Sequence, residues 1–423
     1  MRSAWKLVTR CGDGTNTLGM LANESFRPAI AFIFVTAVLD VMAMGLVIPV
    51  LPQLIEEFSG ANATAGFWNG VLVALWAAMQ FLCSPIIGSL SDRFGRRPTI
   101  LISTAGLAAD WVLMALAPNL WWLAVGRMLG GMTSSSFTTI YAYMADITEP
   151  DKRARGYGLV GAAFSAGFVA GPMLGGVLGE FGPRVPFWAA AGLSALAFLY
   201  GLFVLPESLP REKRMAFAWS RANPFGALRL LRSHPELSGL SIVNFLLYFA
   251  HHVFSAVFVL YAAFRYGWGA FEVGILLGLV GLLDMIVQGV LVGPAVKRWG
   301  DRPVMVFGLA AGAVGIACMG AAPNGWLFTL AMLPNALWGL AMPTLQSLMT
   351  RLVSESEQGQ LQGANMSVAS IAGVASPLFF GWVYVVSVGN APGLSFFIAA
   401  LVLLAGALIG LVVSRRAAAA EGA

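Results

Sequence analysis

The stretch Gly88-Ser-Leu-Ser-Asp-Arg-Phe-Gly-Arg-Arg-Pro98 lies between two long apolar segments. A second stretch, Gly293-Pro-Ala-Val-Lys-Arg-Trp-Gly-Asp-Arg-Pro303, follows 205 residues later with Gly, Arg, Gly, Arg and Pro in register. The same offset relates Pro172 to Pro377, and both prolines lie in apolar runs. Two matches at one offset indicate an internal repeat. Two such halves with a ligand site between them are typical of membrane transporters.

Composition agrees with a membrane environment. Of the 423 residues, 58% are hydrophobic and 11% are charged, whereas about a quarter of a soluble domain is charged. The chain is therefore predicted to be a polytopic all-α membrane protein in the lipid bilayer. Cys11, Cys83 and Cys318 lie far apart and form neither a disulfide framework nor a metal-ligand pattern. No phosphate-binding glycine loop or nucleophile elbow is present, so we expect neither an enzyme nor an ATP-driven pump.

Windows of about 20 apolar residues predict twelve membrane-spanning helices. They are 28–54, 66–90, 98–117, 121–143, 156–181, 186–205, 237–264, 270–296, 303–322, 325–349, 359–387 and 393–414. The polar stretch 206–236 is predicted to link two pseudo-symmetric six-helix halves, 28–205 and 237–414. Residues 1–27 contain no signal-peptide core. We interpret them as a cytoplasmic tail, with Met20 as an alternative start, and 415–423 as a second tail.

The distribution of Lys and Arg predicts the orientation in the membrane. If both termini are cytoplasmic, the tails, the linker and the loops on that side hold 22 of the 25 basic residues. The other side then holds only Arg184 and Arg265, and Arg127 lies within a predicted span. The formal net charge of +5 thus reflects membrane topology, and no nucleic-acid partner is expected.

The 88–98 stretch resembles the loop 2–3 signature of the major facilitator superfamily, G-x-x-x-D-R-x-G-R-R. Its glycines suit close helix packing, and its acid can pair with arginines that favour the carbonyl ends of helices. We interpret it as a latch that closes the cytoplasmic side. A charged topology anchor without a gating role is the alternative. The candidate gating residues in this stretch are Gly88, Asp92, Arg93, Gly95, Arg96 and Arg97.

The fifth predicted span contains Gly167-Phe-Val-Ala-Gly171-Pro172-Met-Leu-Gly175-Gly176, which resembles the signature of proton-coupled antiporters of that superfamily. Small residues allow a neighbouring helix to approach closely, and Pro172 loosens the helix. We therefore assign Gly171 and Pro172 to a bendable seam that takes part in gating. The resemblance implies export, whereas the residues alone also fit a packing helix with no role in direction.

Segments from about residue 30 to 410 are similar to the tetracycline/proton antiporters of this superfamily. Among them are Leu39–Pro52, Ala109-Asp110-Trp111, Gly126–Gly131, Ala341–Gln346 and Gln358–Gly363. The resemblance implies a bacterial cytoplasmic-membrane protein, driven by the proton gradient without a cofactor and functional as a monomer. Gly312 stands where well-studied members carry an aspartate, and Asp284 where they carry a histidine. These departures leave the identity of the drug open.

Ionisable residues within the spans are functional candidates because the bilayer penalises charge. Asp40 lies near the middle of the first span, where a carboxyl group suits reversible proton binding. A hydrogen bond to a neighbouring helix is its structural alternative. Asp110 and Arg127 lie at similar depths in spans three and four. We assign all three to proton coupling, and a static ion pair remains the alternative for Asp110 and Arg127.

Polar faces of several spans predict the substrate cavity. Gly274, Gly281, Asp284 and Gln288 form one stripe of span eight, which is expected to face a cavity and bind a cationic or metal-chelated drug group, or a second proton. A structural role is the alternative. On span seven, His251 and His252 point in different directions, so at most one is expected to line the site. The candidate substrate-binding residues are Asn69, Trp76, Gln80, Tyr248, His251, Asp284, Gln288 and Gln346.

The sequence therefore predicts proton-coupled efflux of a small amphiphilic drug, tetracycline-like or multidrug, by alternating access. Proton-coupled uptake or export of a nutrient or metabolite by the same fold is the first alternative, and the span-five signature disfavours uptake. The second is a membrane sensor that has lost transport. The intact Asp40, Asp110 and Arg127 argue against it.

Overall fold

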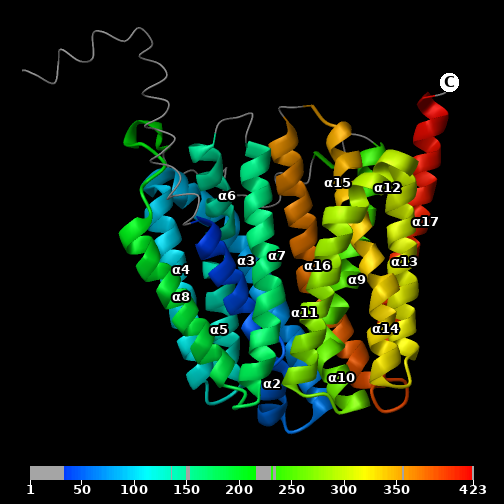
Figure 1. Ribbon diagram of the computed structural model, residues 1–423, viewed down its shortest axis with the longest axis horizontal. Helices are drawn as coiled ribbons and strands as arrows, with labels where there is room; N and C mark the ends of the chain where they lie inside the picture. Colours follow the sequence, from blue (N-terminus) through cyan, green and yellow to red (C-terminus); the bar gives the residue numbers. More distant parts are fainter. Residues whose placement is uncertain are drawn as a thin grey trace, which may run out of the picture.

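The chain folds into a single bundle of helices that run side by side in this computed structural model (Figure 1). The structure describes residues 33–134, 136–148, 153–215, 230–231, 235–354 and 357–421. Every regular element in these ranges is helical, which confirms the predicted fold class. The predicted tail 1–27 and most of the predicted linker 206–236 lie outside the described residues.

The helices of the first half agree closely with the predicted spans. Within the described residues, the two halves together contain eleven segments that are long and apolar enough to cross a membrane, the first being Ile33–Ser59, which ends in α2 (Leu51–Ser59). The fourth predicted span is formed by two shorter helices, between which residue 135 lies outside the described part. The remaining helices are α3 (Asn62–Phe94), α4 (Arg96–Leu116), α5 (Leu120–Thr133), α6 (Ser136–Ile147), α7 (Arg153–Gly179) and α8 (Val185–Val204).

Spans seven, eight and ten of the second half contain short interruptions of the α-helical hydrogen bonding. Such π- and 3₁₀-helical turns are frequent at functional sites. The last helix continues beyond the predicted span end at 414 into the predicted tail. The elements are α9 (Pro235–Val253), η4 (Phe254–Phe258), α10 (Val259–Tyr266), α11 (Ala270–Ile286), η5 (Val287–Leu291), α12 (Val292–Trp299), α13 (Asp301–Ala321), α14 (Gly325–Ala336), η6 (Leu337–Leu340), α15 (Ala341–Arg351), α16 (Gln358–Ser387) and α17 (Leu394–Glu421).

The two ends of the bundle differ in charge. One end, here called the basic end, carries the α3–α4 and α12–α13 turns and is uppermost in Figure 1. Gly95 and Gly300 form these turns at equivalent positions of the repeat, with φ of 109° and 82°. A side chain is strained at positive φ, which explains why glycine occurs in both copies. The other end, here called the opposite end, carries the turns at Gly60, Gly182 and Gly267.

The two halves pack against each other through two seams, α3 with α16 and α7 with α11. In the first seam, the Cα of Gly70 faces the backbone of Pro377. In the second, a Cβ added at Gly274 would lie 2.8 Å from the Cα of Gly176 and would also meet the backbone of Pro172. These contacts lie toward the opposite end, because α3 and α11 begin there and α7 and α16 end there. The repeat-related prolines thus mark two equivalent seams.

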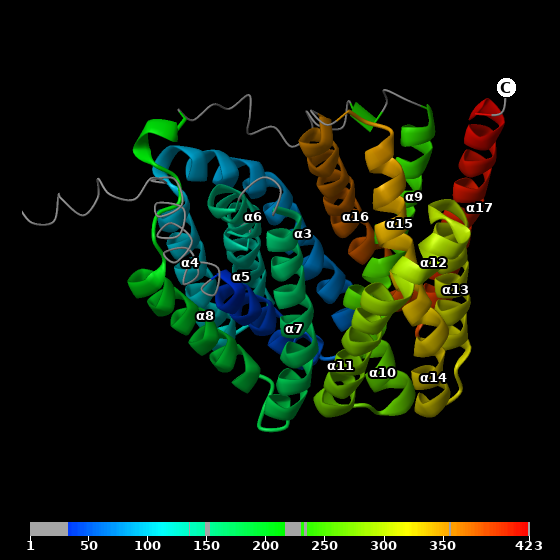
Figure 2. The same cartoon turned by 45° about the horizontal axis from the view of Figure 1, so that its top comes forward.

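Toward the basic end, two repeat-equivalent glycines in α3 and α12 have free space beside them. A Cβ added at Gly88 or at its repeat equivalent Gly293 would meet no atom within 4 Å. The prediction that Gly88 permits close helix packing is therefore wrong for this conformation. Figure 2 shows the helices of the two halves diverging toward the basic end. The halves are in contact at the opposite end and apart at the basic end.

Candidate functional site

The glycines of α7 contact two different neighbours. Gly167, Gly171 and Gly175, spaced four residues apart, pack on the first span, where a Cβ added at Gly171 would lie 2.8 Å from the Cα of Gly45. Gly176 faces α11 of the other half instead. Because both neighbours approach to backbone contact, larger side chains do not fit on either face. The predicted seam at Gly171 and Pro172 is thus a three-helix contact that joins the halves.

Two carboxyl groups are buried in the first half without a hydrogen-bond partner. Asp40 in the first span is 2% exposed, and Asp110 in α4 is 1% exposed. None of their four carboxyl oxygens accepts a hydrogen bond from any described residue. The structural hydrogen bond considered for Asp40 is therefore absent from the described part of this conformation. Buried polar groups are normally satisfied, so an unsatisfied carboxyl group is a candidate for proton exchange.

Arg127 in α5 lies near Asp110 but does not form an ion pair with it. The Arg127 Nε has no hydrogen-bond partner among the described residues, and the guanidinium lies over Trp76, with Cζ 5.6 Å from the ring centroid. The static ion pair considered from the sequence is therefore not formed in this conformation. A cation over an aromatic face is stabilised without an anionic partner.

Two glycines of α5 make room for the Asp110 carboxyl group. A Cβ added at Gly130 would lie 2.5 Å from Asp110 Oδ2, and one at Gly126 would lie 3.0 Å from Oδ1. Both glycines lie in the segment 126–131 that resembles the antiporter group. Their contact with Asp110 was not predicted. The i, i+4 spacing of the two glycines around Arg127 was the signal available in the sequence.

A cavity of about 200 Å³ lies between the halves, next to Arg127. Asn69 donates two hydrogen bonds across this boundary, to the carbonyl oxygens of Ser255 (3.0 Å) and Ala256 (2.8 Å) in η4. In this conformation Asn69 therefore joins the halves rather than offering its amide N–H groups to a substrate. The cavity is lined by Met44, Val47, Ile48, Leu51, Pro52, Asn69, Val73, Trp76, Ala77, Leu107, Trp111, Arg127, Gly130, His252, Phe254, Ser255 and Val259.

The structure places His252, not His251, on this cavity. The Nδ1 atom of His252 lies 3.3 Å from the Ser255 hydroxyl. The His251 ring lies against Trp338 instead, with a centroid distance of 5.6 Å. As expected, the two histidines face different surroundings. The prediction that His251 lines the site is wrong for this cavity, because His252 lines it instead. Tyr248, half-buried on α9, does not line this cavity.

Gln80 lies one helical turn beyond Trp76 on α3 and contacts α5. Its Nε2 donates to the Ser134 hydroxyl at 3.5 Å, which is at the long limit for a hydrogen bond. Asn69, Trp76 and Arg127 therefore meet at the cavity, whereas Gln80 lies beside it, on the side toward the basic end.

The predicted polar stripe of span eight does not face one surface. Gly274 and Gly281 pack against α7, at Gly176 and Val169, so the expectation that they line a cavity is wrong. Asp284 abuts Gly339 in η6 and accepts a 2.7 Å hydrogen bond from Gln288. At 100° per residue, Asp284 is turned by about 80° from Gly274, which separates it from the glycine face.

Gln346 belongs to a chain of four amide side chains in the second half. Its Nε2 donates to Gln362 Oε1 at 2.6 Å, and its Oε1 accepts from Asn365 at 3.3 Å. Asn244 donates to Asn365 at 3.4 Å. Gln362 is exposed and Asn244 is buried, so the chain leads from an accessible group into the packed helices α9, α15 and α16. The sequence identified Gln346 but not the partners that orient it.

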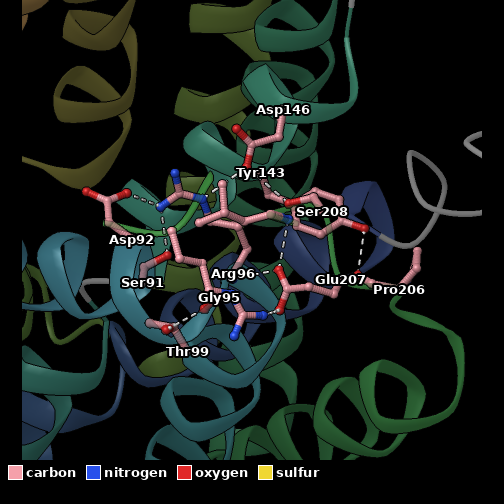
Figure 3. Close-up of polar contacts among 12 residues, drawn as sticks. Ser91, Asp92, Gly95, Arg96, Thr99, Tyr143, Asp146, Pro206, Glu207 and Ser208 are labelled. Atoms are coloured by element: carbon pink, nitrogen blue, oxygen red, sulfur yellow. Dashed lines mark hydrogen bonds and ion pairs between the residues drawn. The ribbon is translucent and has the colours of Figure 1, made fainter. Parts of the chain in front are cut away.

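The loop between α3 and α4 is held by a buried arginine (Figure 3). Arg96 pairs with Asp92 at 2.7 Å and with Asp146 of α6 at 3.0 Å, and its backbone N–H donates to Glu207 at 2.9 Å. Arg97 donates to the Leu202 carbonyl near the end of α8 at 2.8 Å, which agrees with the expected preference for helix carbonyl ends.

All of these partners belong to the first half or to the start of the linker. Asp146, Glu207 and Arg214, which pairs with Glu207 at 3.7 Å, were not predicted as members of the cluster. The exposed Arg93 lies over Phe94 at 5.0 Å from the ring centroid.

The equivalent cluster of the second half has inverted charges. The repeat offset of 205 places Lys297 at the position of Asp92, Asp301 at that of Arg96, and Arg351 at that of Asp146. Asp301, 7% exposed, pairs with Arg351 at 2.6 Å. In both copies, an ion pair therefore joins the residue after the glycine turn to a second helix: Arg96 to Asp146 of α6, and Asp301 to Arg351 of α15. At these three equivalent positions the formal charges sum to −1 in the first half (Asp92, Arg96, Asp146) and to +1 in the second (Lys297, Asp301, Arg351).

Comparison with known proteins agrees with this architecture. The family model described as Major Facilitator Superfamily matches residues 33–292 and 240–422. The tetracycline resistance protein, class C, of Escherichia coli is 38% identical over 376 residues, covering 89% of this chain and 94% of that protein. The class G protein of Vibrio anguillarum is 37% identical, covering 86% and 93%.

Among solved structures, that of the nucleoside transporter NupG has a TM-score of 0.75 at 13% identity, covering 91% of this chain and 98% of that one. At that identity the likeness concerns the fold alone. The family match covers most of the chain, and the relatives above 30% identity align over nearly their whole length. The chain therefore belongs to the Major Facilitator Superfamily and, within it, to the family of the tetracycline resistance proteins.

Proposed function

We propose that this protein exports a tetracycline-type amphiphilic drug in exchange for protons, using the cavity next to Arg127 and Trp76. The observation that carries the proposal is the buried Asp110, which lacks a hydrogen-bond partner among the described residues and contacts Gly130, a residue that lines this cavity. A carboxyl group that alternates between proton-bound and proton-free forms can bias the transporter toward different conformations. The relatives named tetracycline resistance proteins supply the class of substrate.

The basic end is assigned to the cytoplasm of a bacterium, with both termini there. The positive-inside distribution of Lys and Arg supports this orientation. The conformation described here then has the cytoplasmic side open, and drug enters from the cytoplasm or inner leaflet. Asp284, Gln288 and Gln346 do not line this cavity in the present conformation, and they would contact the drug from the second half in another conformation. The protein works as a monomer in the inner membrane, and the two six-helix halves are the moving bodies.

Asp40 is assigned a second role in proton coupling. It lies in the first span, which packs on the glycine face of α7. The next residue, Val41, contacts Gly167 of α7. A change of charge at Asp40 would therefore act on the helix that also seals the opposite end. Arg127 would respond to the charge of Asp110, turning between the carboxylate and the Trp76 ring as the proton leaves or returns.

The two inverted clusters are assigned to gating. In this conformation Asp92 and Asp146 are paired within the first half, and Arg351 within the second. One seam places α3 beside α16, and α16 follows α15, which carries Arg351. The other seam places α7 beside α11, and α11 continues into α12, which carries Lys297. When the basic end closes, Asp92 would approach Arg351 and Asp146 would approach Lys297. Opposite charges at these positions favour closure without a new binding partner.

Drug efflux in a pump-deficient host tests the proposed function. The wild type should confer resistance to a tetracycline, with phenicols, quinolones and a cationic dye as comparison compounds. Asp110→Asn should abolish resistance and Asp40→Asn should reduce it. Glu180→Gln, the same change at an exposed acid of the opposite end, should leave resistance intact. If Asp110→Asn keeps wild-type resistance at equal expression, or if no compound separates wild type from empty vector, the proposal is wrong.

A further inference from the structure

A second pocket of about 590 Å³ lies at the opposite end, between the start of α11 and the start of α14, away from the cavity described above. Trp268 forms one wall, packed directly on Gly325. Tyr266 fixes another by donating to the Ala322 carbonyl at 2.9 Å. The volume is in the range of small-ligand sites. Its lining residues lie where α11 and α14 begin, and the ends of membrane-spanning helices are expected near the lipid headgroups.

The pocket contains one cation and one anion. Arg265 is exposed and forms no hydrogen bond or ion pair with the described residues. The other basic residue predicted on this side, Arg184, donates to the Ala115 carbonyl at 2.7 Å and lies over Phe58. Glu272 uses one oxygen to accept from the Gly269 N–H at 2.8 Å, and its other oxygen has no protein donor among the described residues. Among the described residues, the pocket therefore presents a cation without a protein partner and an anion with one free carboxylate oxygen.

Two further features favour a phosphate group beside Arg265. The pocket is lined by Asn324 and Gly325, at the N-terminus of α14. Asn324 caps only the Leu327 N–H, so the N–H groups of Gly325 and Trp326 keep no side-chain acceptor among the described residues. The N-terminal end of a helix carries partial positive charge and binds anions. The cation and the helix end thus line the same pocket.

An apolar stripe leads from this polar pocket into the membrane. Phe271, Ile275 and Leu279 are spaced four residues apart on α11 and are 41%, 45% and 37% exposed. Residues spaced by four follow one face of a helix, so the stripe extends about 12 Å from the bundle end toward the bilayer centre. An acyl chain can lie along it while its headgroup occupies the pocket.

We propose that this pocket binds a zwitterionic phospholipid whose headgroup carries a primary amine. Arg265 and the α14 N-terminus bind the phosphate, and Glu272 accepts hydrogen bonds from the ammonium group. The side chains of Trp268 and Trp326 flank the headgroup, as aromatic residues do at membrane interfaces. A quaternary ammonium headgroup cannot donate hydrogen bonds to Glu272, and an anionic headgroup without an amine is repelled by it. The proposal does not depend on the transported substrate.

Native mass spectrometry of the delipidated full-length protein tests the assignment, with phosphatidylethanolamine, phosphatidylcholine and phosphatidylglycerol of equal chain length. Wild type should bind one phosphatidylethanolamine more tightly than the other two lipids. Arg265→Gln should weaken that binding by about tenfold, the effect of losing a charge-assisted contact. Glu272→Gln should remove the preference over phosphatidylcholine. Arg298→Gln, the same change at an exposed site of the basic end, should change neither.

Thr329→Trp provides a second test that leaves both charges in place, because Thr329 lines the pocket. It should block binding while the melting temperature of the lipid-free protein stays near that of wild type. Unchanged phosphatidylethanolamine binding in Arg265→Gln or in Thr329→Trp overturns the proposal. Equal affinity of wild type for the three lipids also overturns it. Displacement of the lipid by tetracycline would instead identify a drug site and refute the assignment.

Discussion

Substitution of one seam glycine should reverse the preference of this transporter for the conformation described here. Gly274 touches α7 at the opposite end, where a Cβ would lie 2.8 Å from the Cα of Gly176 and 3.0 Å from its backbone nitrogen. Both atoms are backbone, so no side chain can move aside. Gly274→Val therefore disfavours the conformation that is sealed at the opposite end. The other conformation, in which this seam separates, is unaffected by the added atoms.

The expected size of the effect follows from overpacking. Inserting atoms into a close contact costs about 1–3 kcal/mol, and the conformational equilibrium shifts by roughly 5- to 150-fold for such a difference. Gly293→Val is the matched control on the same span, because a Cβ there meets no atom within 4 Å. It leaves the present conformation unstrained and disfavours closure of the basic end. The two valines should therefore act in opposite directions.

Distances between spin labels at Phe94→Cys and Trp299→Cys measure the opening of the basic end. Both residues are exposed, and they occupy equivalent positions of the repeat. The native cysteines are replaced by serine. Wild type should show a long distance, Gly274→Val should shift the population toward a short one, and Gly293→Val should stay long. Equal distributions for both valine variants would refute the reasoning, and a lengthening in Gly274→Val would contradict it outright.

Three further predictions concern single contacts. Gly130→Ala places a methyl group against Asp110 and should reduce proton-driven drug uptake into everted vesicles by at least about tenfold, equivalent to 1.4 kcal/mol. Gly161→Ala, where a Cβ meets nothing within 4 Å, should leave uptake unchanged. Equal uptake by the two variants would contradict the role of Gly130. Arg351→Asp should lower the melting temperature because it leaves the buried Asp301 carboxylate unpaired. Adding Asp301→Arg to that variant should restore much of the lost melting temperature. If the double variant melts no higher than Arg351→Asp, a specific pair between the two positions is refuted. Asn69→Ala removes two hydrogen bonds between the halves and should shift the conformational equilibrium by about 1–3 kcal/mol away from the state sealed at the opposite end. An unchanged distance between the spin labels at positions 94 and 299 would show that these bonds do not favour this conformation.

The sequence was sufficient for the architecture because lipid imposes a strong pattern on it. Span length and loop charge reflect the bilayer, the 205-residue offset reflects an internal repeat, and none of the three depends on detailed packing. Eleven of the twelve predicted spans therefore correspond to candidate spans among the described residues, and the fourth corresponds to the two shorter helices α5 and α6. Residue 135 falls within the fourth span and is outside the described residues.

The surroundings of individual residues depended on packing that the sequence does not display. Gly88 was expected to pack closely, but it faces open space in this conformation. His251 was chosen over His252, although adjacent residues of one helix differ by about 100° in direction. Asn365 became a partner of Gln346 only because α15 and α16 lie side by side. The inverted charges were present in the aligned repeat, yet their pairing required knowledge of which helices meet.

Proton–drug exchange in everted membrane vesicles tests the central claim most directly. With an acidic lumen, wild-type vesicles should accumulate a tetracycline while protons leave the lumen, and collapse of the gradient should release the drug. Asp110→Asn vesicles should do neither, although drug binding to the purified variant remains measurable. Accumulation that persists in Asp110→Asn, or that proceeds in wild type without proton movement, would contradict the account.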